Sequence, residues 1–521
     1  MTTKRFRGQF LSLGVGVLVF LVFPFSNGRS ELKGAEVDVG PSVSRLAVGS
    51  SSAEKPNILL VYVDDLGWKD TGYMGSDFYE TPHIDKLAEG GMVFTQAYSC
   101  AANCAPARAS LLSGQYTPRH QIYNVNTKPR GNSAHRRLEH VAGVSTLDPS
   151  IRTWGHQLQV AGYKTATMGK WHLSDDPTLY GFDVNVGGTH SGGPPQGYYP
   201  PHGKAPGLEV APKGEYVTDR LSEEACEFIT ENADRPWMLY LTHFAVHTPI
   251  QAKKELVAKY AAKQSGLLHR DVKMATMIQA VDDGVGKIVA TLERLEIRDS
   301  TVIIFYSDNG GYGPVTDMDP IKGYKGTYYE GGIRVPFFVN WPGAVQPEQQ
   351  SEEPVIGVDL YPTLCEIGGA PLPEGQVSDG VSLVRILKGE ASDLGEEGQP
   401  RALFWHFPAY LQSYKNVYDE QRDPLFRSRP CSLIRKGNWK LIQFFESGDL
   451  ELYDLDNDLA EKTNLANANA EITTELLSNL QAWQSETNAA IPLAKNPKFD
   501  EAKEQAAIQK MNRNQELRSG K

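Results

Sequence analysis

The sequence predicts an α/β protein with a large mixed, mainly parallel sheet sandwiched by helices, and a smaller C-terminal domain of antiparallel sheet plus helix. Apolar, β-branched runs at 57–63, 237–242 and 301–306 have the composition of buried parallel strands, and helical patterns separate them. Beyond 400, short strand-like runs follow one another with glycine-containing turns between them, which is typical of an antiparallel meander.

Length and charge narrow the class of function. The chain has 521 residues, too many for one hydrophobic core, so we expect a large domain and a smaller one. Its formal net charge is −11 and it has no long basic block, which argues against nucleic acid as a partner. An anionic ligand would have to be bound by a local cluster of cations.

The N-terminus has the features of an export signal. Basic residues precede an apolar run at 10–25, and polar sequence follows. We predict a signal peptide at 1–27, a linker at 28–54, and a periplasmic or secreted protein with no membrane attachment after the signal is cleaved. An uncleaved anchor is the alternative, although the run is short for a membrane span.

The remaining elements follow in chain order. Further strands of the N-terminal domain, 55–390, are predicted at 92–98, 163–168 and 337–341, and helices at 83–90, 152–161, 217–232, 275–292 and 360–367. An acidic, glycine-rich stretch at 388–400 indicates a domain boundary. In the C-terminal domain, 400–490, strands are predicted at 402–407, 431–434, 439–445 and 450–454, and a helix at 470–487. Residues 491–521 are expected to form an ill-ordered or peripheral polar tail.

Four strands of the N-terminal domain end in polar or charged residues. In chain order these are Asp64 and Asp65, Lys170 and His172, His247, and Asp308 and Asn309. In parallel α/β sheets, ligands bind at the carboxyl ends of the strands. Each group taken alone also fits a solvated loop, a surface lysine or a core histidine. Their coincidence at strand ends favours a single functional site.

The segment 104–114 predicts a short helix that begins at a cysteine. Pro106 suits the first helical turn, so Cys104 would lie over the free N–H groups at the helix start, with Arg108 one turn further on. A nucleophile beside a fixed cation is suited to attack on an anionic ester, and a buried structural cysteine is the alternative. The five cysteines form neither a disulfide framework nor a metal-ligand spacing.

The segment 181–212 is rich in glycine, proline and aromatic residues, and it contains His190 and His202. It is too long and irregular for a plain connector, so we predict a loop that covers a site and contacts the substrate. Arg427 and Arg429, at the entry to the C-terminal meander, would close the other side of the pocket. Exposed loops often have the same composition, so these substrate contacts are hypotheses.

In their order along the chain, the motifs resemble those of the formylglycine-dependent type I sulfatases, arylsulfatase-like members of the alkaline-phosphatase-like superfamily. The resemblance covers most of 55–490 and is carried by Asp64-Asp65-Leu66-Gly67, Cys104-x-Pro-x-Arg108, Gly169-Lys170-Trp171-His172, His247-Thr248-Pro249, Ser307-Asp308-Asn309-Gly310 and Lys325 ahead of Glu330-Gly331-Gly332. Each motif is weak alone, and together they are specific. The family usually has Ser or Thr at the position of Ala105 and often Ser at the position of Ala107. The Cys-x-Pro-x-Arg frame itself is kept.

The resemblance implies that a formylglycine-generating enzyme oxidises Cys104 to formylglycine, whose hydrate attacks sulfur and then collapses to release sulfate. It further implies one divalent cation, joined by the modified Cys104, with four further protein ligands: Asp64, Asp65, Asp308 and Asn309. These protein donors are oxygens and several are carboxylates, which favours Ca²⁺ over Mg²⁺.

The resemblance also implies roles for the remaining side chains. Arg108 would fix the formylglycine diol and the charge on the metal side of the site. Lys170 and Lys325 would bind sulfate oxygens as point charges. His172 would take the proton from the second hydroxyl, and His247 would protonate the leaving alcohol.

We therefore predict an exported sulfuric ester hydrolase that acts on a sulfated glycan or small molecule. One alternative is a formylglycine-dependent phosphate or phosphonate ester hydrolase, because some relatives use the same group on phosphorus. A second alternative, from another class, is an inactive glycan-binding relative. The sequence does not separate sulfated carbohydrates from aryl or alkyl sulfates.

Overall fold

The computed structural model describes residues 55–396, 398–414 and 422–519, with side chains up to 514. The predicted signal peptide and linker lie outside these residues. The described residues all belong to one compact unit. Among the residues that the structure describes, no helix has the length and apolar character needed to cross a membrane.

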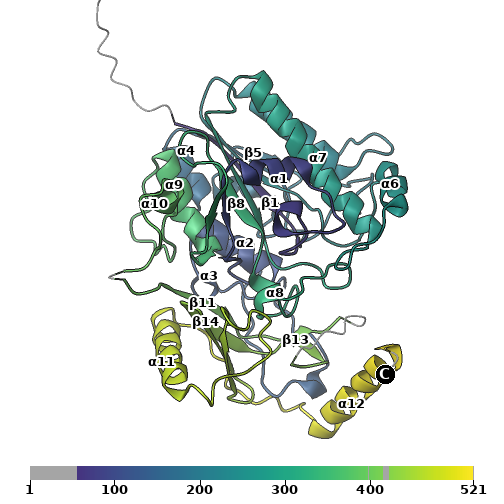
Figure 1. Ribbon diagram of the computed structural model, residues 1–521, viewed down its shortest axis with the longest axis vertical. Helices are drawn as coiled ribbons and strands as arrows, with labels where there is room; N and C mark the ends of the chain where they lie inside the picture. Colours follow the sequence, from purple (N-terminus) through teal and green to yellow (C-terminus); the bar gives the residue numbers. More distant parts are fainter. Residues whose placement is uncertain (1–54, 397, 415–421, 520–521) are drawn as a thin grey trace, which may run out of the picture. The chain divides into compact units, whose positions relative to one another are not determined.

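An eight-stranded mixed sheet forms the centre of the N-terminal part (Figure 1). β8 runs opposite to the other seven strands, so the predicted mainly parallel sheet is confirmed. In spatial order the strands are β5 (Val184–Val186), β4 (Lys164–Gly169), β6 (Trp237–Thr242), β1 (Asn57–Val63), β7 (Thr301–Ser307), β8 (Phe337–Asn340), β2 (Met92–Phe94) and β9 (Gln349–Ser351).

Helices cover both faces of this sheet, which explains why every residue of β1 is buried. Alternate residues of β1 belong to two hydrophobic clusters: Leu59 and Val61 to one, Leu60 and Tyr62 to the other. The first cluster includes α1 (Pro82–Glu89), α5 (Val217–Glu231), α6 (Val257–Ala262) and α7 (Val272–Arg294). The second includes α2 (Cys104–Ser113), α4 (Trp154–Val160), α9 (Leu360–Gly368) and α10 (Val384–Leu387).

Shorter elements connect these layers, and one predicted strand is divided. Instead of one strand at 92–98, the chain forms β2 and then β3 (Ala97–Tyr98), which pairs with β10 (Val355–Ile356). The cause is a change of partner, because Phe94 pairs with β9 whereas Ala97 pairs with β10. The other short elements are α3 (Thr117–His120), α8 (Glu330–Ile333), and the 3₁₀ turns Gly72–Met74, Ser133–His135, Pro177–Tyr180, Lys254–Leu256 and Gly357–Asp359.

The predicted C-terminal antiparallel sheet is confirmed. Its strands, in spatial order, are β11 (Ala402–Phe407), β14 (Cys431–Lys436), β15 (Trp439–Phe444) and β16 (Leu450–Asp454), and β12 (Leu411–Gln412) pairs separately with β13 (Phe426–Ser428). Helix α11 (Ala470–Glu486) buries Leu476 and Leu480 against this sheet. The same cluster includes Tyr98 and Ile333 of the N-terminal part, so the two sheets share apolar contacts.

A helix that the sequence analysis did not predict, α12 (Glu501–Ser519), lies in the expected tail (Figure 1). Its Glu504 side chain is 2% exposed and forms ion pairs with Arg137 and Arg429, at 3.0 and 2.9 Å. The tail is polar throughout, so hydrophobic periodicity gave no sign of the helix. Ion pairing with distant residues fixes its first turn.

Candidate active site

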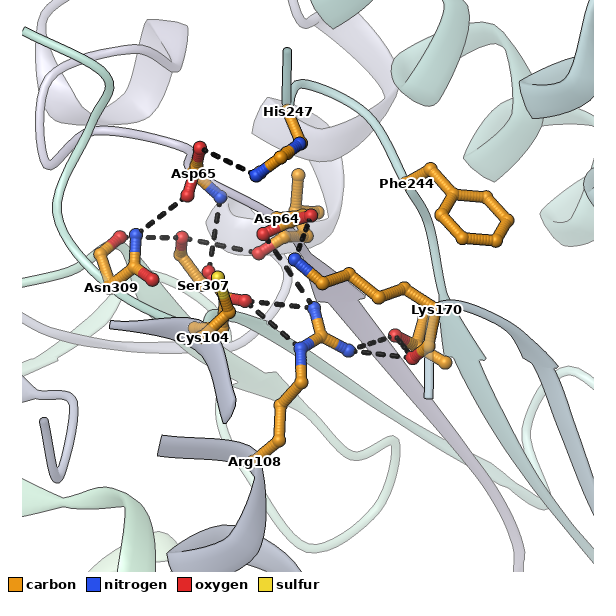
Figure 2. A network of polar contacts seen from close by, with 12 residues as sticks. Asp64, Asp65, Cys104, Arg108, Lys170, Phe244, His247, Ser307 and Asn309 are labelled. Carbon is orange, nitrogen blue, oxygen red and sulfur yellow. Dashed lines mark hydrogen bonds and ion pairs between the residues drawn. The ribbon is translucent and has the colours of Figure 1, made fainter. Parts of the chain in front are cut away.

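The parallel register brings the carboxyl ends of four strands level. Val63, the last residue of β1, lies opposite Ser307 of β7, and Gly169 of β4 lies opposite Thr242 of β6. Polar residues predicted from the sequence follow three of these ends directly: Asp64 and Asp65 after β1, Lys170 after β4, and Asp308 and Asn309 after β7. The start of α2 adds Cys104 and Arg108 to the same place (Figure 2).

Three potential metal ligands lie close together. One ligand atom each from Asp64, Cys104 and Asp308 lies within 4.8 Å of the other two, and all three residues are buried. The Oδ1 atoms of Asp64 and Asn309 are buried and have no hydrogen-bond partner in the described part of the chain. A buried oxygen without a partner is costly, and a divalent cation would satisfy both atoms. The donor set therefore fits a hard cation.

Three cations balance the carboxylates. Lys170 Nζ lies 2.5 Å from Asp64 Oδ2, and Lys325 Nζ lies 2.5 Å from Asp65 Oδ1. Arg108 donates to Asp308 Oδ2 from Nε at 3.1 Å and from Nη2 at 2.9 Å (Figure 2).

The carboxylates respond to these neighbours in different ways. Burial, followed by the charge of Asp64, raises the pKa of Asp308 to about 7, although Arg108 opposes the shift. Burial would also raise the pKa of Asp65, but the adjacent Lys325 holds it well below its usual range. The site therefore places mutually repelling carboxylates in a dry setting, where a further positive charge would stabilise their ionised forms.

The Cys104 side chain lies among these charges. Lys325 Nζ is 3.4 Å from Cys104 Sγ. Burial raises the pKa of the Cys104 thiol, although Lys170 and Lys325 oppose the shift. The side chain is therefore a neutral thiol at neutral pH, and a neutral thiol is a poor nucleophile.

Both predicted histidines join the site and are neutral there. Burial, and next Lys170, lower the pKa of His172 well below its usual value, and its Nδ1 has no hydrogen-bond partner among the described residues. Burial, and next Lys325, lower the pKa of His247 to about 3. The Nδ1 of His247 is 2.8 Å from the carbonyl oxygen of Thr248, so the Nδ1–H tautomer donates there, with Nε2 lying 3.9 Å from Asp65 Oδ2.

Two of these residues hold an uncommon backbone conformation. Asp65 has φ of 61° and His172 has φ of 66°, in the left-handed region that residues other than glycine seldom adopt. Such strain gathers at functional sites, where the surrounding structure enforces it.

The segment 181–212 lies against both histidines, as the loop prediction requires. A Cβ atom on Gly192 would be 2.4 Å from His172 Cε1, and one on Gly193 would be 3.7 Å from His247 Nδ1. The histidines of the segment itself lie apart from this contact: His190 Nε2 is 3.4 Å from Thr146 Oγ1, and His202 is buried within the loop beside the carbonyl oxygen of Pro195.

The two predicted arginines differ. Arg427 donates from Nη1 to the carbonyl oxygen of Lys325 at 3.0 Å, which places it beside the site. Arg429 is enclosed by three carboxylates, those of Asp423, Glu446 and Glu504. Its charge is already neutralised by these carboxylates, and its part in closing the pocket stays a prediction.

Two polar residues at the strand ends were given no role from the sequence, although one of them, Ser307, belongs to a quoted motif. Thr242, the last residue of β6, accepts a hydrogen bond at 2.5 Å from Arg108 Nη1. Ser307, the last residue of β7, donates to the carbonyl oxygen of Leu66 at 2.9 Å and so fixes the turn that follows Asp65. Both are hydroxyl side chains that end strands of the parallel sheet, and that position is the feature of the sequence that indicates a place at the site.

Comparisons with known proteins agree with this geometry. Residues 56–370 match the family model described as Sulfatase, and residues 324–486 match the model described as N-sulphoglucosamine sulphohydrolase, C-terminal. A protein named Sulfatase from Formosa agariphila is 32% identical over 540 residues, an alignment covering 87% of this chain and 92% of the relative.

Two further relatives are similar over most of their length. The human N-acetylgalactosamine-6-sulfatase is 29% identical over 71% of this chain and 76% of its own. The crystal structure of Ps i-CgsB in complex with k-i-k-neocarrahexaose is 30% identical with a TM-score of 0.67, and it covers 82% of this chain and 93% of that one.

Proposed function

This chain belongs to the sulfatase family and is a sulfuric ester hydrolase of the alkaline-phosphatase-like fold, and we propose that it removes sulfate from sulfated carbohydrates. In this proposal, Cys104 is converted to formylglycine by a maturation enzyme, and one Ca²⁺ is bound beside it. We further propose that the protein is exported, because its first residues have the composition of a signal peptide. The division into domains at 55–390 and 400–490 remains a prediction.

The observation that carries the proposal is that carboxylates and an ammonium group surround Cys104. A buried, neutral thiol lies within 4.8 Å of carboxylate oxygens of Asp64 and Asp308 and 3.4 Å from the ammonium of Lys325. The thiol is unsuited to attack in this state, whereas its surroundings are suited to bind an anion. Conversion to an aldehyde hydrate would supply two hydroxyl groups on one carbon, one for attack on sulfur and one for release of sulfate.

Four residues would hold the cation: Asp64, Asp65, Asp308 and Asn309. The proposal rests on the two buried oxygens that have no hydrogen-bond partner among the described residues, Asp64 Oδ1 and Asn309 Oδ1. When bound, Ca²⁺ would lower the pKa of the attacking hydroxyl and offset charge on the sulfate oxygens. Arg108 keeps Asp308 in place through two hydrogen bonds and also donates to the carbonyl oxygen of Lys170 at 2.8 Å.

The lysines and histidines complete the chemistry. Lys170 and Lys325 would bind the sulfate oxygens, because each ends beside a carboxylate at the position where the anion would enter. His172 would accept a proton, since it is neutral and its Nδ1 is free of described partners. His247 would donate a proton to the leaving alcohol from Nε2, which must first take up that proton because the resting ring carries its hydrogen on Nδ1.

A carbohydrate substrate is supported by the relatives and by the loop. The human relative is named for a sulfated amino sugar, and the Ps i-CgsB structure holds a neocarrahexaose. In this chain, the segment 181–212 packs Gly192 against the His172 ring and Gly193 near the His247 ring, so this loop borders the site. We propose on this basis that a sulfated sugar enters beneath that loop.

Peptide mass spectrometry and turnover test the proposal together. Protein made with a formylglycine-generating enzyme should show, in the tryptic peptide 87–108, the mass loss expected when a thiol is replaced by an aldehyde. Cys104→Ala should abolish turnover of an aryl sulfate, and Cys104→Ser should leave little, because serine offers no second hydroxyl. Cys226→Ser, at a half-buried thiol on α5, is the matched control and should retain activity. Full activity with an unmodified Cys104 would refute the mechanism.

Metal content provides the second test. Active protein should contain one Ca²⁺ per chain, and Asp308→Asn should lose both the ion and most activity. Folding should persist, because β7 is held by apolar burial on both faces. An aryl phosphate hydrolysed faster than the matching aryl sulfate, or zinc in the active protein, would favour a phosphate ester hydrolase instead.

A further inference from the structure

Two arginines, Arg130 and Arg427, lie beside the proposed catalytic centre, and neither has a carboxylate partner among the residues that the structure describes. Arg427 is 8% exposed and donates to two backbone carbonyl oxygens, that of Lys325 at 3.0 Å and that of Gln412 at 2.9 Å. Arg130 is half-buried and makes no hydrogen bond or ion pair with any residue that the structure describes.

Two other arginines of the C-terminal part are paired with carboxylates. Arg422 contacts the carboxylates of Asp449 and Glu451. Arg429 contacts those of Asp423, Glu446 and Glu504. No described carboxylate pairs with Arg130 or Arg427, so their charge is available to an anionic ligand.

The two guanidinium groups are close enough to affect one another. A Cβ atom on Gly131 would be 2.5 Å from Phe426 Cε1, so the backbone next to Arg130 lies against the residue that precedes Arg427. Burial, and next the like charge of Arg427, lower the pKa of Arg130. Two partly desolvated cations repel each other, and an anion bound between them would relieve that repulsion.

The pair is continuous with the site of sulfate chemistry. Arg427 binds the backbone of Lys325, whose ammonium is 3.4 Å from Cys104 Sγ. The Arg427 guanidinium also lies 3.9 Å from the ring centre of Tyr414, and the Tyr312 ring lies 5.1 Å from that of Tyr414. Flat aromatic surface next to cations is what an anionic pyranose ring would contact.

From this arrangement we propose that Arg130 and Arg427 bind a second anionic group of the substrate, a carboxylate or another sulfate. The inference rests on the proposed function only in taking Cys104 as the position of the scissile sulfate. A guanidinium suits either group, because its planar fork matches two oxygens of one oxyanion. The substrate class is then a sulfated saccharide with at least two negative charges, one cleaved and one recognised.

Binding to full-length protein carrying Cys104→Ala tests the inference without any need for turnover. Calorimetry would compare hexose monosulfates with the matching hexose disulfates and with monosulfated uronic acids, each as a set of positional isomers. At least one dianion should bind about ten-fold more tightly than its matched monosulfate. Whether the disulfate or the uronate gains more identifies the second anion.

Substitutions then assign the gain to these residues. Adding Arg130→Gln or Arg427→Gln should remove about ten-fold of affinity for the dianion and much less for the monosulfate. Arg130→Lys should retain part of the gain, because it keeps the charge and loses the fork. The control is Lys128→Gln, which removes an exposed positive charge from the same loop and should leave the preference unchanged.

Two outcomes would overturn the inference: no dianion in the panel gains from its second charge, or the gain survives both arginine substitutions. In the active enzyme, the same variants should raise KM for the dianion more than they lower kcat. If modified protein fails to hydrolyse any sulfate ester, the proposed function fails, and the binding measurements still decide whether this second anion site exists.

Discussion

His247 has neighbours that act on its proton in opposite directions. Burial and the lysines lower its pKa to about 3, whereas the charge of Asp65 raises it. The resting imidazole is therefore neutral, with Nδ1 committed to the carbonyl oxygen of Thr248. A bound sulfate ester would add negative charge beside Lys170 and Lys325, weaken their effect on the ring, and so favour a proton on Nε2.

This arrangement predicts that His247→Ala will affect substrates according to their leaving group. A sugar alkoxide is a poor leaving group, so loss of the general acid should cost about 10²–10⁴-fold in kcat/KM, and an activated phenol should lose far less. A series of aryl sulfates with phenols of increasing pKa would measure this, because the variant should depend more steeply on that pKa than the unsubstituted enzyme. Parallel lines for the two proteins would contradict the assigned role.

At the scale of single residues, the sequence was informative where the backbone decides the position. Asp64, Lys170 and Asp308 could be predicted because each follows a strand directly, and parallel strands end at one edge. Arg429 could not, because the carboxylates that neutralise it include Glu504, 75 residues further along the chain. The position of Arg130 also depends on a residue far along the chain, because its loop is placed by contact with β13, and so it could not be predicted.

At the scale of elements, the loop over the site acts through its glycines. The ring of His172 occupies the space that a side chain on Gly192 would need, at 2.4 Å from the added Cβ atom. Gly193 has more room, since its nearest neighbour, His247 Nδ1, would be 3.7 Å away. A methyl group on Gly192 would therefore displace the His172 ring, whereas one on Gly193 would fit without displacing His247.

Gly192→Ala should consequently displace the His172 ring and lower kcat by about ten-fold or more, a factor within the range for a misplaced catalytic group. Unfolding stability should also fall by about 1–3 kcal/mol, because the buried ring must move to make room, so kcat is measured where the variant is still folded. Gly193→Ala is the matched control and should stay near the unsubstituted activity. Equal losses in the two variants would show that the loop as a whole, and not the His172 contact, limits the reaction.

A buried histidine connects the start of α7 to the turn after β1. His269 Nε2 lies 3.3 Å from Asp70 Oδ1 and its Nδ1 lies 3.5 Å from Asp77 Oδ1, while Asp70 Oδ2 accepts from the Gly67 amide at 2.7 Å. Burial alone would lower the pKa of His269, but the hydrogen bond and charge of Asp70, followed by Asp77, raise it.

A raised pKa in the folded state gives stability that is fully present below the unfolded value, about 6.5, and is lost as pH rises through the folded value. His269→Gln should therefore destabilise the protein most below about pH 6.5 and progressively less at higher pH. Urea unfolding midpoints between about pH 6 and about pH 9 would show the two curves converging. The exposed His83→Gln is the control, and a gap that widens with pH would contradict this ion pair.

Element by element, periodicity predicted the buried strands well and the polar helix poorly. β6 and β16 have the predicted bounds, because β6 is a mainly apolar run and β16 is a short run with glutamate and aspartate among its apolar residues, closed by a turn. The strand at 92–98 was divided, since no local pattern shows that β2 and β3 have different partners. Helix α12 was missed because it has no apolar face and is anchored by Glu504.

At the scale of the whole molecule, a buried charge network joins the C-terminal sheet to the catalytic part. Lys440 of β15 lies 3.0 Å from Glu330 Oε1 and 2.8 Å from Glu461 Oε1, and all three side chains are fully buried. Glu461 Oε2 also accepts from the Glu330 amide at 2.6 Å. Glu330 begins α8, five residues after Lys325, so the network positions the segment that carries the lysine proposed to bind sulfate.

Lys440→Met should therefore destabilise the protein by about 3–5 kcal/mol, because it leaves two buried carboxylates without their shared cation. Adding Glu461→Gln should recover part of that loss, since one of the two charges is removed. Lys436→Met is the matched control on the same sheet: its partner Glu475 is 57% exposed, so the expected change is within about 1 kcal/mol. Denaturant unfolding would measure all three.

Sulfatase turnover under conditions where Lys440→Met is still folded should also fall, because α8 and Lys325 lose their fixed position. A Lys440 variant as stable as the Lys436 variant would mean that apolar contacts alone join the two sheets.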